Sequence, residues 1–211
     1  MSDEDTAKPL FAYAPVGPRF EIKDIANCIA GSGIPYPTAH ARVKIYAKPA
    51  KGDGLTLIHV REAGRATQPN IYEFSDAGAA LVLSALQDAG ISDHQIMREA
   101  HWALYGWQHR AEERDSKYII AGQSHKPRHP IDRAILGVSR GESWTFTVEI
   151  WRDMQTGERI ASCDLTQTGD SVIGRHEMTS TMQRQVTVIV TLDLLLLPVI
   201  RRLMPKERQS H

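Results

Sequence analysis

The sequence has little cysteine and no long apolar run. Only two of its 211 residues are cysteines, Cys28 and Cys163, and two thiols cannot cross-link a chain of this length into a disulfide scaffold. The most apolar region, residues 186–203, is interrupted by charged residues and a proline, and it is shorter than the ~20 apolar residues that span a bilayer. The start, Met-Ser-Asp-Glu-Asp, is acidic where a signal peptide is basic and then apolar. We therefore expect a cytoplasmic protein that does not enter a membrane.

The sequence also lacks motifs for catalysis, cofactors and metals. Gly31-Ser32-Gly33 does not follow a strand pattern, so it does not predict a dinucleotide-binding loop. His125 and His129 are four residues apart, but prolines break this stretch and no cysteine pair lies nearby, whereas a metal site needs several converging ligands. No nucleophile motif or paired-carboxylate spacing occurs. We therefore expect no enzyme activity, no cofactor and no metal.

Composition and charge are those of a globular protein with one basic segment. Apolar residues make up 42% and charged residues 24% of the chain, and 25 basic residues balance 25 acidic ones. Residues 35–70 hold six basic and two acidic residues, whereas residues 71–115 hold three basic and eight acidic residues. Because phosphate contacts depend on local geometry, a neutral protein with such a segment can still bind a polyanion.

Two short helices are expected in the first half. Apolar residues of 20–30 recur mostly at helical spacing, and Gly31-Ser32-Gly33 ends this helix because glycine readily takes the left-handed C-cap conformation. Thr38 is a suitable N-cap for a second helix over 39–47. Glycines and a proline in residues 48–54 end that helix.

A β-hairpin is expected next, followed by a helix. Residues 55–60 and 71–74 have strand character, and the polar tip between them carries Arg61 and Arg65. Ser75 is predicted to cap the following helix, because a serine hydroxyl satisfies a free N–H at a helix start.

The first half is expected to end in a linker. Ser92 and Gln95 have capping-box spacing for a further helix that reaches about residue 109. Glycine and prolines in residues 116–133 favour a linker, and residues 1–19 have the composition of a flexible arm. The first domain is therefore expected over residues 20–115.

The second half changes character. Apolar residues alternate cleanly over 144–151, a partner strand is expected over 159–165, and residues 179–192 are rich in β-branched side chains. Residues 194–204 favour a terminal helix. The expected fold class is therefore α+β, with a small β-rich domain for dimerisation or effector binding over 134–211.

The first half resembles the MerR-type winged helix-turn-helix family. Arg42-Val-Lys44-Ile-Tyr46 stands where the family favours a T-L-R-Y-Y-like ending of its recognition helix. Tyr72-Glu-Phe74-Ser75-Asp76, a helix and then Gly90-Ile-Ser92-Asp-His-Gln95-Ile96 resemble the family's next two helix starts. The resemblance covers residues 20–110, under half of the chain, and implies that the hairpin is the wing.

The resemblance implies a DNA interface on the second helix and on the wing. Small residues at the start of that helix let it approach the floor of the major groove. The contact residues implied for base edges or phosphates are Thr38, His40, Arg42, Lys44, Tyr46, Arg61 and Arg65. The residues themselves leave alternatives open, because Arg42 and Lys44 also suit a solvated helix face and Tyr46 also suits a core.

The sequence thus predicts a sequence-specific transcriptional regulator from a bacterium or a mobile element. It is expected to bind double-stranded DNA as a homodimer, since two-fold symmetric readers bind inverted half-sites. A small-molecule effector is left open. The alternatives are an excisionase-like architectural DNA-binding factor and a protein-interaction module that does not bind DNA.

Overall fold

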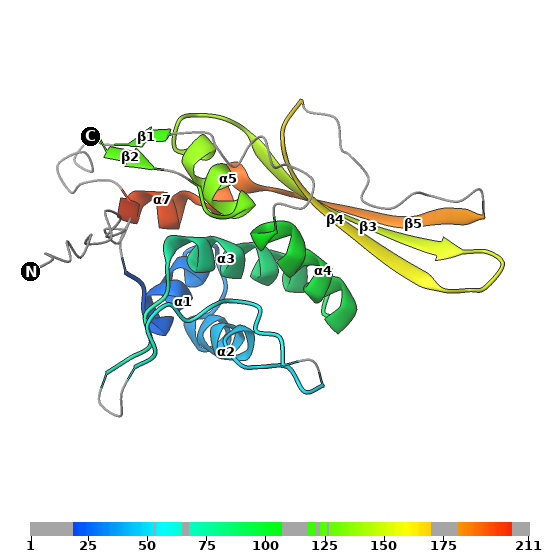
Figure 1. Cartoon of the computed structure of the whole chain (residues 1–211), viewed down its shortest axis with the longest axis horizontal. Helices are drawn as coiled ribbons and strands as arrows, with labels where there is room; N and C mark the ends of the chain where they lie inside the picture. The colour runs from blue at the N-terminus through cyan, green and yellow to red at the C-terminus, as the bar shows by residue number, and fades with distance from the viewer. Residues whose placement is uncertain are drawn as a thin grey trace, which may run out of the picture.

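The chain folds as an α+β structure (Figure 1). A computed structural model describes residues 19–52, 54–64, 68–106, 118–120, 123–125, 127–169 and 181–203. In these ranges it contains seven helices, a three-stranded antiparallel sheet and a short two-stranded ribbon. None of the helices within them has the length and the apolar character needed to cross a bilayer.

The first two helices lie where the sequence predicts them, with one shifted start. Helix α1 spans Ile22–Ala30, and α2 spans Tyr36–Tyr46. The cap predicted at Thr38 is wrong, because Pro35 is the N-cap and Thr38 lies inside the helix. A proline is tolerated here because the first-turn N–H groups of a helix have no intrahelical acceptor.

The wing hairpin predicted over residues 55–74 does not form as two regular strands. One antiparallel bridge joins Glu62 and Ile71, and Tyr72 forms its bridge with Phe20 instead. The backbone N–H groups of Leu57 and Ile58 donate to the Tyr46 carbonyl over 2.9 and 3.2 Å. The segment is therefore drawn towards the end of α2, where it satisfies a helix-terminal acceptor instead of a partner strand.

Carboxylates, and not the predicted serines, cap the next two helices. Helix α3 spans Phe74–Asp88 with Glu73 as N-cap, and α4 spans His94–Tyr105 with Asp93 as N-cap. The Asp93 side chain accepts from the N–H groups of the second and third helical residues at 2.9 and 3.1 Å. The caps predicted at Ser75 and Ser92 are therefore wrong by two residues and one residue. The carboxylates carry a charge that the helix dipole favours.

Regular structure also occurs in the stretch predicted as a linker. Strands β1 (Tyr118–Ile120) and β2 (Gln123–His125) pair antiparallel, and helix α5 spans Pro130–Val138. Ile131 and Ile135 of α5 are fully buried. Their approach to α3 is so close that a Cβ on Gly78 would lie 2.6 Å from Ile135 Cδ1.

The sheet of the second half agrees with the predicted alternation. Strands β3 (Trp144–Asp153), β4 (Arg159–Gln167) and β5 (Met182–Thr191) are antiparallel in the order β4-β3-β5. Trp144, Phe146, Val148 and Ile150 are buried on one face, as predicted. The terminal helix is split into α6 (Leu192–Leu195) and α7 (Leu197–Leu203).

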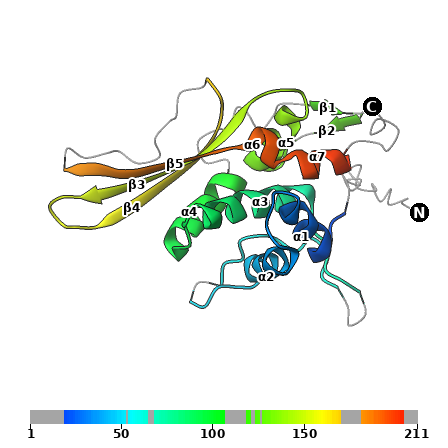
Figure 2. The ribbon, with the colours of Figure 1, turned by 180° about the vertical axis from the view of Figure 1, so that it is seen from behind.

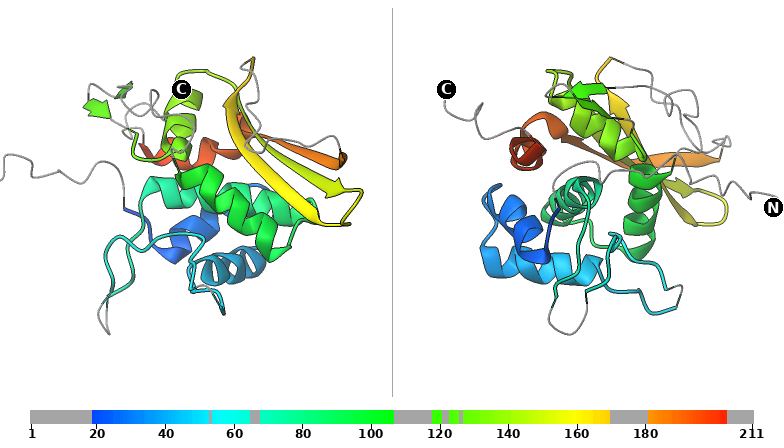
Figure 3. Two further views of the ribbon diagram at one scale, coloured as in Figure 1. Left: turned by 45° about the vertical axis from the view of Figure 1, so that its right-hand side comes forward. Right: turned by 60° about the vertical axis from the view of Figure 1, so that its left-hand side comes forward.

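Helices cover the inner face of the sheet, while its far end projects. Helix α4 lies against β4, and β3, β4 and β5 extend past it as an arm (Figures 1 and 3). From behind, α7 lies beside the first helices (Figure 2). There Arg202 reaches Asp24 of α1 at 3.1 Å. Helix α7, the last of the described helices, thus contacts α1, the first.

One hydrophobic cluster joins the two halves of the sequence. It includes buried residues of α1 to α4 together with residues of α5, β3, β4, α6 and α7. Residues 116–133 were predicted to separate two domains, but α5 begins within that range and contributes Ile131 to the shared cluster. Among the described residues, apolar side chains of the first half are therefore partly covered by residues of the second half.

We expect Ile135→Ala to destabilise the whole fold. The side chain is fully buried between α5 and α3, and removal of a buried isoleucine side chain to Cβ costs about 2–5 kcal/mol. Urea unfolding followed by tryptophan fluorescence and by circular dichroism should give one shared transition at lower urea. Ile189→Ala is the matched control, because Ile189 is 63% exposed. Two separate transitions would contradict a shared core.

Candidate nucleic-acid interface

Helix α2 has one buried face and one exposed face. Ala39, Val43 and Tyr46 are fully buried. The opposite side, here called the α2 outer face, consists of exposed or half-buried residues that continue into the turn after the helix: Tyr36, Thr38, His40, Ala41, Lys44, Ile45 and Lys48. Helix α2 contains no acidic residue. Helix α2 itself therefore contributes no negative charge that would repel a polyanion.

Two side chains, Arg42 and Tyr46, fix α2 on α3 through four hydrogen bonds. Arg42 Nη1 donates to the Ser84 hydroxyl at 2.7 Å and to its carbonyl at 3.2 Å. Arg42 Nη2 donates to Asp88 Oδ1 at 2.8 Å. The Tyr46 hydroxyl donates to Gln87 Oε1 at 2.9 Å. These contacts set the rotation of α2 about its axis and so determine which side chains face outward.

Two of the residues predicted to touch DNA therefore have another role. Tyr46 is fully buried, and the phosphate contact predicted for it is wrong. The Arg42 side chain is 18% exposed and is held by Asp88, so it attaches α2 to α3, and the contact with base edges or phosphates predicted for it stays a prediction. Both residues belong to the side of α2 that rests on α3.

Three other predicted residues do lie on the α2 outer face. Thr38 and Lys44 are exposed, and His40 is half-buried. The His40 ring stacks on Tyr36, with ring centroids 5.7 Å apart and planes 20° apart. Lys44 has no ion-pair partner among the described residues. The prediction that these side chains contact DNA stays a prediction.

Of the two arginines predicted at the tip of the wing, the structure describes only Arg61. Arg61 lies on the segment before the Glu62 bridge, and its Nη1 contacts Glu73 Oε1 at 2.7 Å. Its side chain is 24% exposed. Arg65 lies outside the described residues. Arg61 therefore anchors the segment to α3 and does not extend from a tip.

Sequence reasoning missed three of the larger side chains of the α2 outer face. Tyr36 is 42% exposed and Ile45 is 61% exposed, and Lys48 follows directly in the turn after the helix. A signal was present, because Tyr36, His40, Lys44 and Lys48 are spaced by four residues and so share one side of a helix. The prediction began the helix at residue 39 and therefore hid this spacing.

The segment that follows α2 is seated on α3 and α4 by Asp76. The His59 N–H and the Tyr105 hydroxyl both donate to Asp76 Oδ1 at 2.8 Å. The Glu73 N–H donates to Oδ2 at 2.9 Å. His101 Nδ1 lies 3.2 Å from the Leu57 carbonyl. One buried carboxylate thus joins the segment to the start of α3 and the end of α4.

Burial shifts the pKa values of this cluster. It raises the pKa of Asp76, an effect that its three donors oppose. It lowers the pKa of His59 and lowers that of His101 to about 4. It raises the pKa of the neighbouring Asp132 to about 6. Both histidines are therefore neutral at pH 7.

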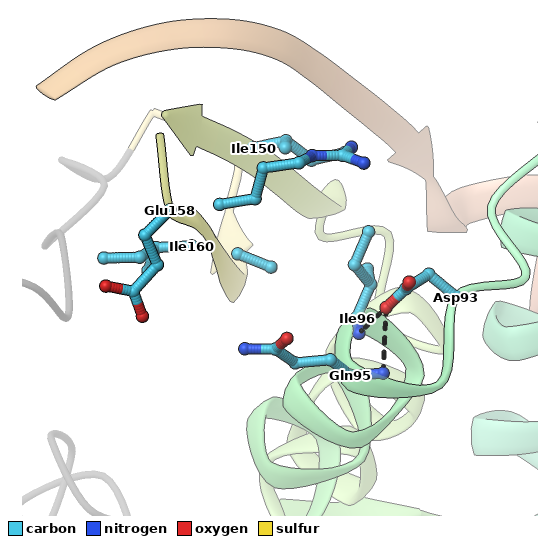
Figure 4. A pocket seen from close by; sticks show the side chains of 8 residues that line it. Asp93, Gln95, Ile96, Ile150, Glu158 and Ile160 are labelled. Atoms are coloured by element: carbon cyan, nitrogen blue, oxygen red, sulfur yellow. Dashed lines mark hydrogen bonds between the residues drawn. The ribbon is translucent and has the colours of Figure 1, made fainter. Parts of the chain in front are cut away.

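A hollow lies between the start of α4 and the projecting arm. Its volume is about 410 Å³, and Ile96, Ile150 and Ile160 form its apolar side. Asp93, the N-cap of α4, and Gln95 of α4 lie across it from Glu158 of the arm (Figure 4). The polar residues at its rim include both acidic and basic side chains. These lining residues do not form a convergent set of catalytic groups.

No known protein identifies the chain. Comparisons with protein-family models, with curated proteins and with solved structures give no match. No group of three or more histidine, cysteine or acidic side chains placed to hold a metal ion occurs in the described part of the chain. A functional assignment therefore depends on the geometry of α2 and of the segment beside it.

We expect His101→Gln to reduce the loss of stability in acid. The neutral His101 ring favours the fold above its usual pKa of 6.5, and this contribution is lost as the pH falls through about 4. The wild-type free energy of unfolding should therefore lose about 2 kcal/mol more than that of the variant between pH 7 and pH 5.

Urea titrations at the two pH values measure this difference. Asp132 affects the free energy of unfolding in the opposite direction. The stability that its neutral carboxyl group contributes is full below the usual pKa of 3.8 and is lost as the pH rises through about 6. It is present in both proteins and cancels in the comparison. His94→Gln, at an exposed position of the same helix, is the control. An equal acid loss in all three proteins would contradict a role for His101.

Proposed function

We propose that the protein is a sequence-specific DNA-binding transcriptional regulator whose recognition helix is α2. The supporting observation is the α2 outer face. It carries Lys44 on a helix that has no acidic residue and Lys48 in the turn directly after that helix. Helices α1 and α2, joined by the short turn of residues 31–35, form the helix-turn-helix in this proposal. The irregular segment after α2 takes the place of a wing.

The chemistry of the outer face suits a DNA groove. Thr38 and Ala41 are small and exposed, so the backbone of α2 can come close to base edges. His40 lies beside them and supplies a hydrogen-bonding ring. Lys44 and Lys48 lie towards the C-terminal end, where they can reach phosphates. Phosphate contacts supply affinity and base contacts supply specificity.

The proposal includes a homodimer. Strand β5 lies at one edge of the sheet and pairs only with β3 among the described strands. Val186 and Ile189 on this strand are 45% and 63% exposed. An apolar edge strand favours pairing with another chain. A two-fold dimer would present two α2 helices to an inverted repeat.

A second candidate function is a protein-interaction module that uses the same face. The observation that favours it is the exposure of two large apolar side chains there, Tyr36 and Ile45. Exposed aromatic side chains are enriched at protein interfaces. Salt separates the candidates, because DNA binding weakens steeply with salt and an apolar protein contact does not.

We expect Lys44→Gln and Lys48→Gln each to weaken DNA binding and to reduce the salt dependence. Loss of one phosphate contact should lower the slope of log K against log salt by about one unit. The measurement is a fluorescence anisotropy titration at several salt concentrations, with DNA selected from a random pool by the wild-type protein.

Arg159→Gln is the control, since this exposed arginine lies on the projecting arm. It removes the same unit of charge at a distance from α2. An equal effect of all three substitutions would mean that net charge, and not the α2 outer face, governs binding. Failure to select any sequence would contradict sequence-specific recognition.

A further inference from the structure

A small cavity lies where the segment after α2 meets the starts of α3 and α5. Its volume is about 260 Å³. Charged, hydroxyl and imidazole side chains line it from four parts of the fold. The lining residues used below are His59, Arg61, Glu73, Asp76, Arg128 and His129.

Two guanidinium groups converge in this cavity on one oxygen atom. Arg61 Nη1 and Arg128 Nη1 lie 2.7 and 2.9 Å from Glu73 Oε1. Both groups are therefore within hydrogen-bonding reach of a single point. The Arg61 guanidinium has no other partner among the described residues, so most of its five donors are unused there.

The carboxylates of the cavity have far less spare capacity. Both oxygens of Asp76 accept hydrogen bonds, from three donors in all. Glu73 accepts from both arginines and also from the backbone at the start of α3. The two carboxylates offset the charge of the two arginines, so unused donors, and not net charge, distinguish the cavity. A ligand rich in acceptors satisfies such donors.

We propose that this cavity binds a small oxyanion, a carboxylate or a phosphate, between Arg61 and Arg128. Guanidinium groups bind both kinds of oxyanion through paired N–H donors. The rings of His59 and His129 lie in the same lining and add donors. The ligand shares the two arginines with Glu73.

Occupancy of the cavity is transmitted to α2 through a short stretch of chain. His59 directly follows Leu57 and Ile58, and Arg61 lies three positions after Ile58. The N–H groups of Leu57 and Ile58 donate to the Tyr46 carbonyl at the end of α2. A ligand that shares Arg61 with Glu73 shifts the Arg61 side chain and, with it, this stretch. This step depends on the proposed function, because it makes the cavity an effector site for DNA binding.

Calorimetric titration of the full chain with sodium phosphate and, separately, with sodium malonate tests the site. Sodium chloride at matched ionic strength is the blank. We expect saturable binding of at least one anion at one site per chain, and the two arms distinguish phosphate from carboxylate. Arg128→Gln and Arg61→Gln should each weaken it about tenfold or more.

The control variant is Arg159→Gln, which removes a charge at the other hollow and should leave anion binding unchanged. Thermal unfolding of each variant establishes that it is folded. Absence of saturable binding, or equal binding by wild type and Arg128→Gln, would overturn the site. Arg128→Gln serves as the second variant because its side chain is 41% exposed, so it disturbs the fold less than Arg61→Gln.

DNA titrations with and without the bound anion, at constant ionic strength, test the coupling. We expect the anion to change the DNA affinity of the wild type at least threefold and to leave that of Arg128→Gln unchanged. Equal DNA affinity in both conditions would overturn the coupling. Lys44→Gln separates the two proposals, because it should weaken DNA binding and retain anion binding. If the protein binds no DNA, the anion titrations still test the proposed cavity site by themselves.

Discussion

The buried carboxylate of Asp76 is the contact on which the arrangement of the first half depends. It accepts from the Glu73 N–H at the start of α3, from the His59 N–H and from the Tyr105 hydroxyl at the end of α4. A buried carboxylate without such donors would cost several kcal/mol. The three donors can satisfy this carboxylate only when the start of α3, the segment after α2 and the end of α4 come together. The packing of each of these parts therefore depends on the other two.

The same logic continues from Asp76 to α2. The segment that Asp76 holds supplies two N–H groups to the Tyr46 carbonyl, while Arg42 binds Ser84 and Asp88 on α3. Helix α2 is thus fixed at its end and along one side. A helix that reads a groove needs this rigidity, because a side chain displaced by 1 Å loses the geometry of its hydrogen bonds. The side chains that hold α2 thus use polar groups for contacts within the fold.

The alternating pattern of apolar residues predicted strand β3 well, whereas the contacts of polar side chains were predicted poorly. The alternation of apolar residues placed β3, because a buried face repeats every second residue whatever lies against it. The family-like ending that contains Arg42 and Tyr46 gave both residues a contact role, yet local spacing cannot reveal that Ser84 and Gln87 lie opposite them. Such partners are about forty residues away in sequence, and only the fold brings them together.

The regular hairpin was mispredicted, and a helix begins within the predicted linker, for a related reason. Leu57 and Ile58 have strand-forming neighbours, but their N–H groups are used by a helix end, and a helix end is a tertiary partner that propensity does not include. Residues 130–138 begin with a proline and follow another, which favours a linker, yet a proline in a first turn is compatible with a helix. Burial of Ile131 and Ile135 then stabilises that helix. When a helix is stabilised by packing against residues distant in the sequence, its own sequence is insufficient to predict it. The cavity beside α5 likewise exists only because that helix forms.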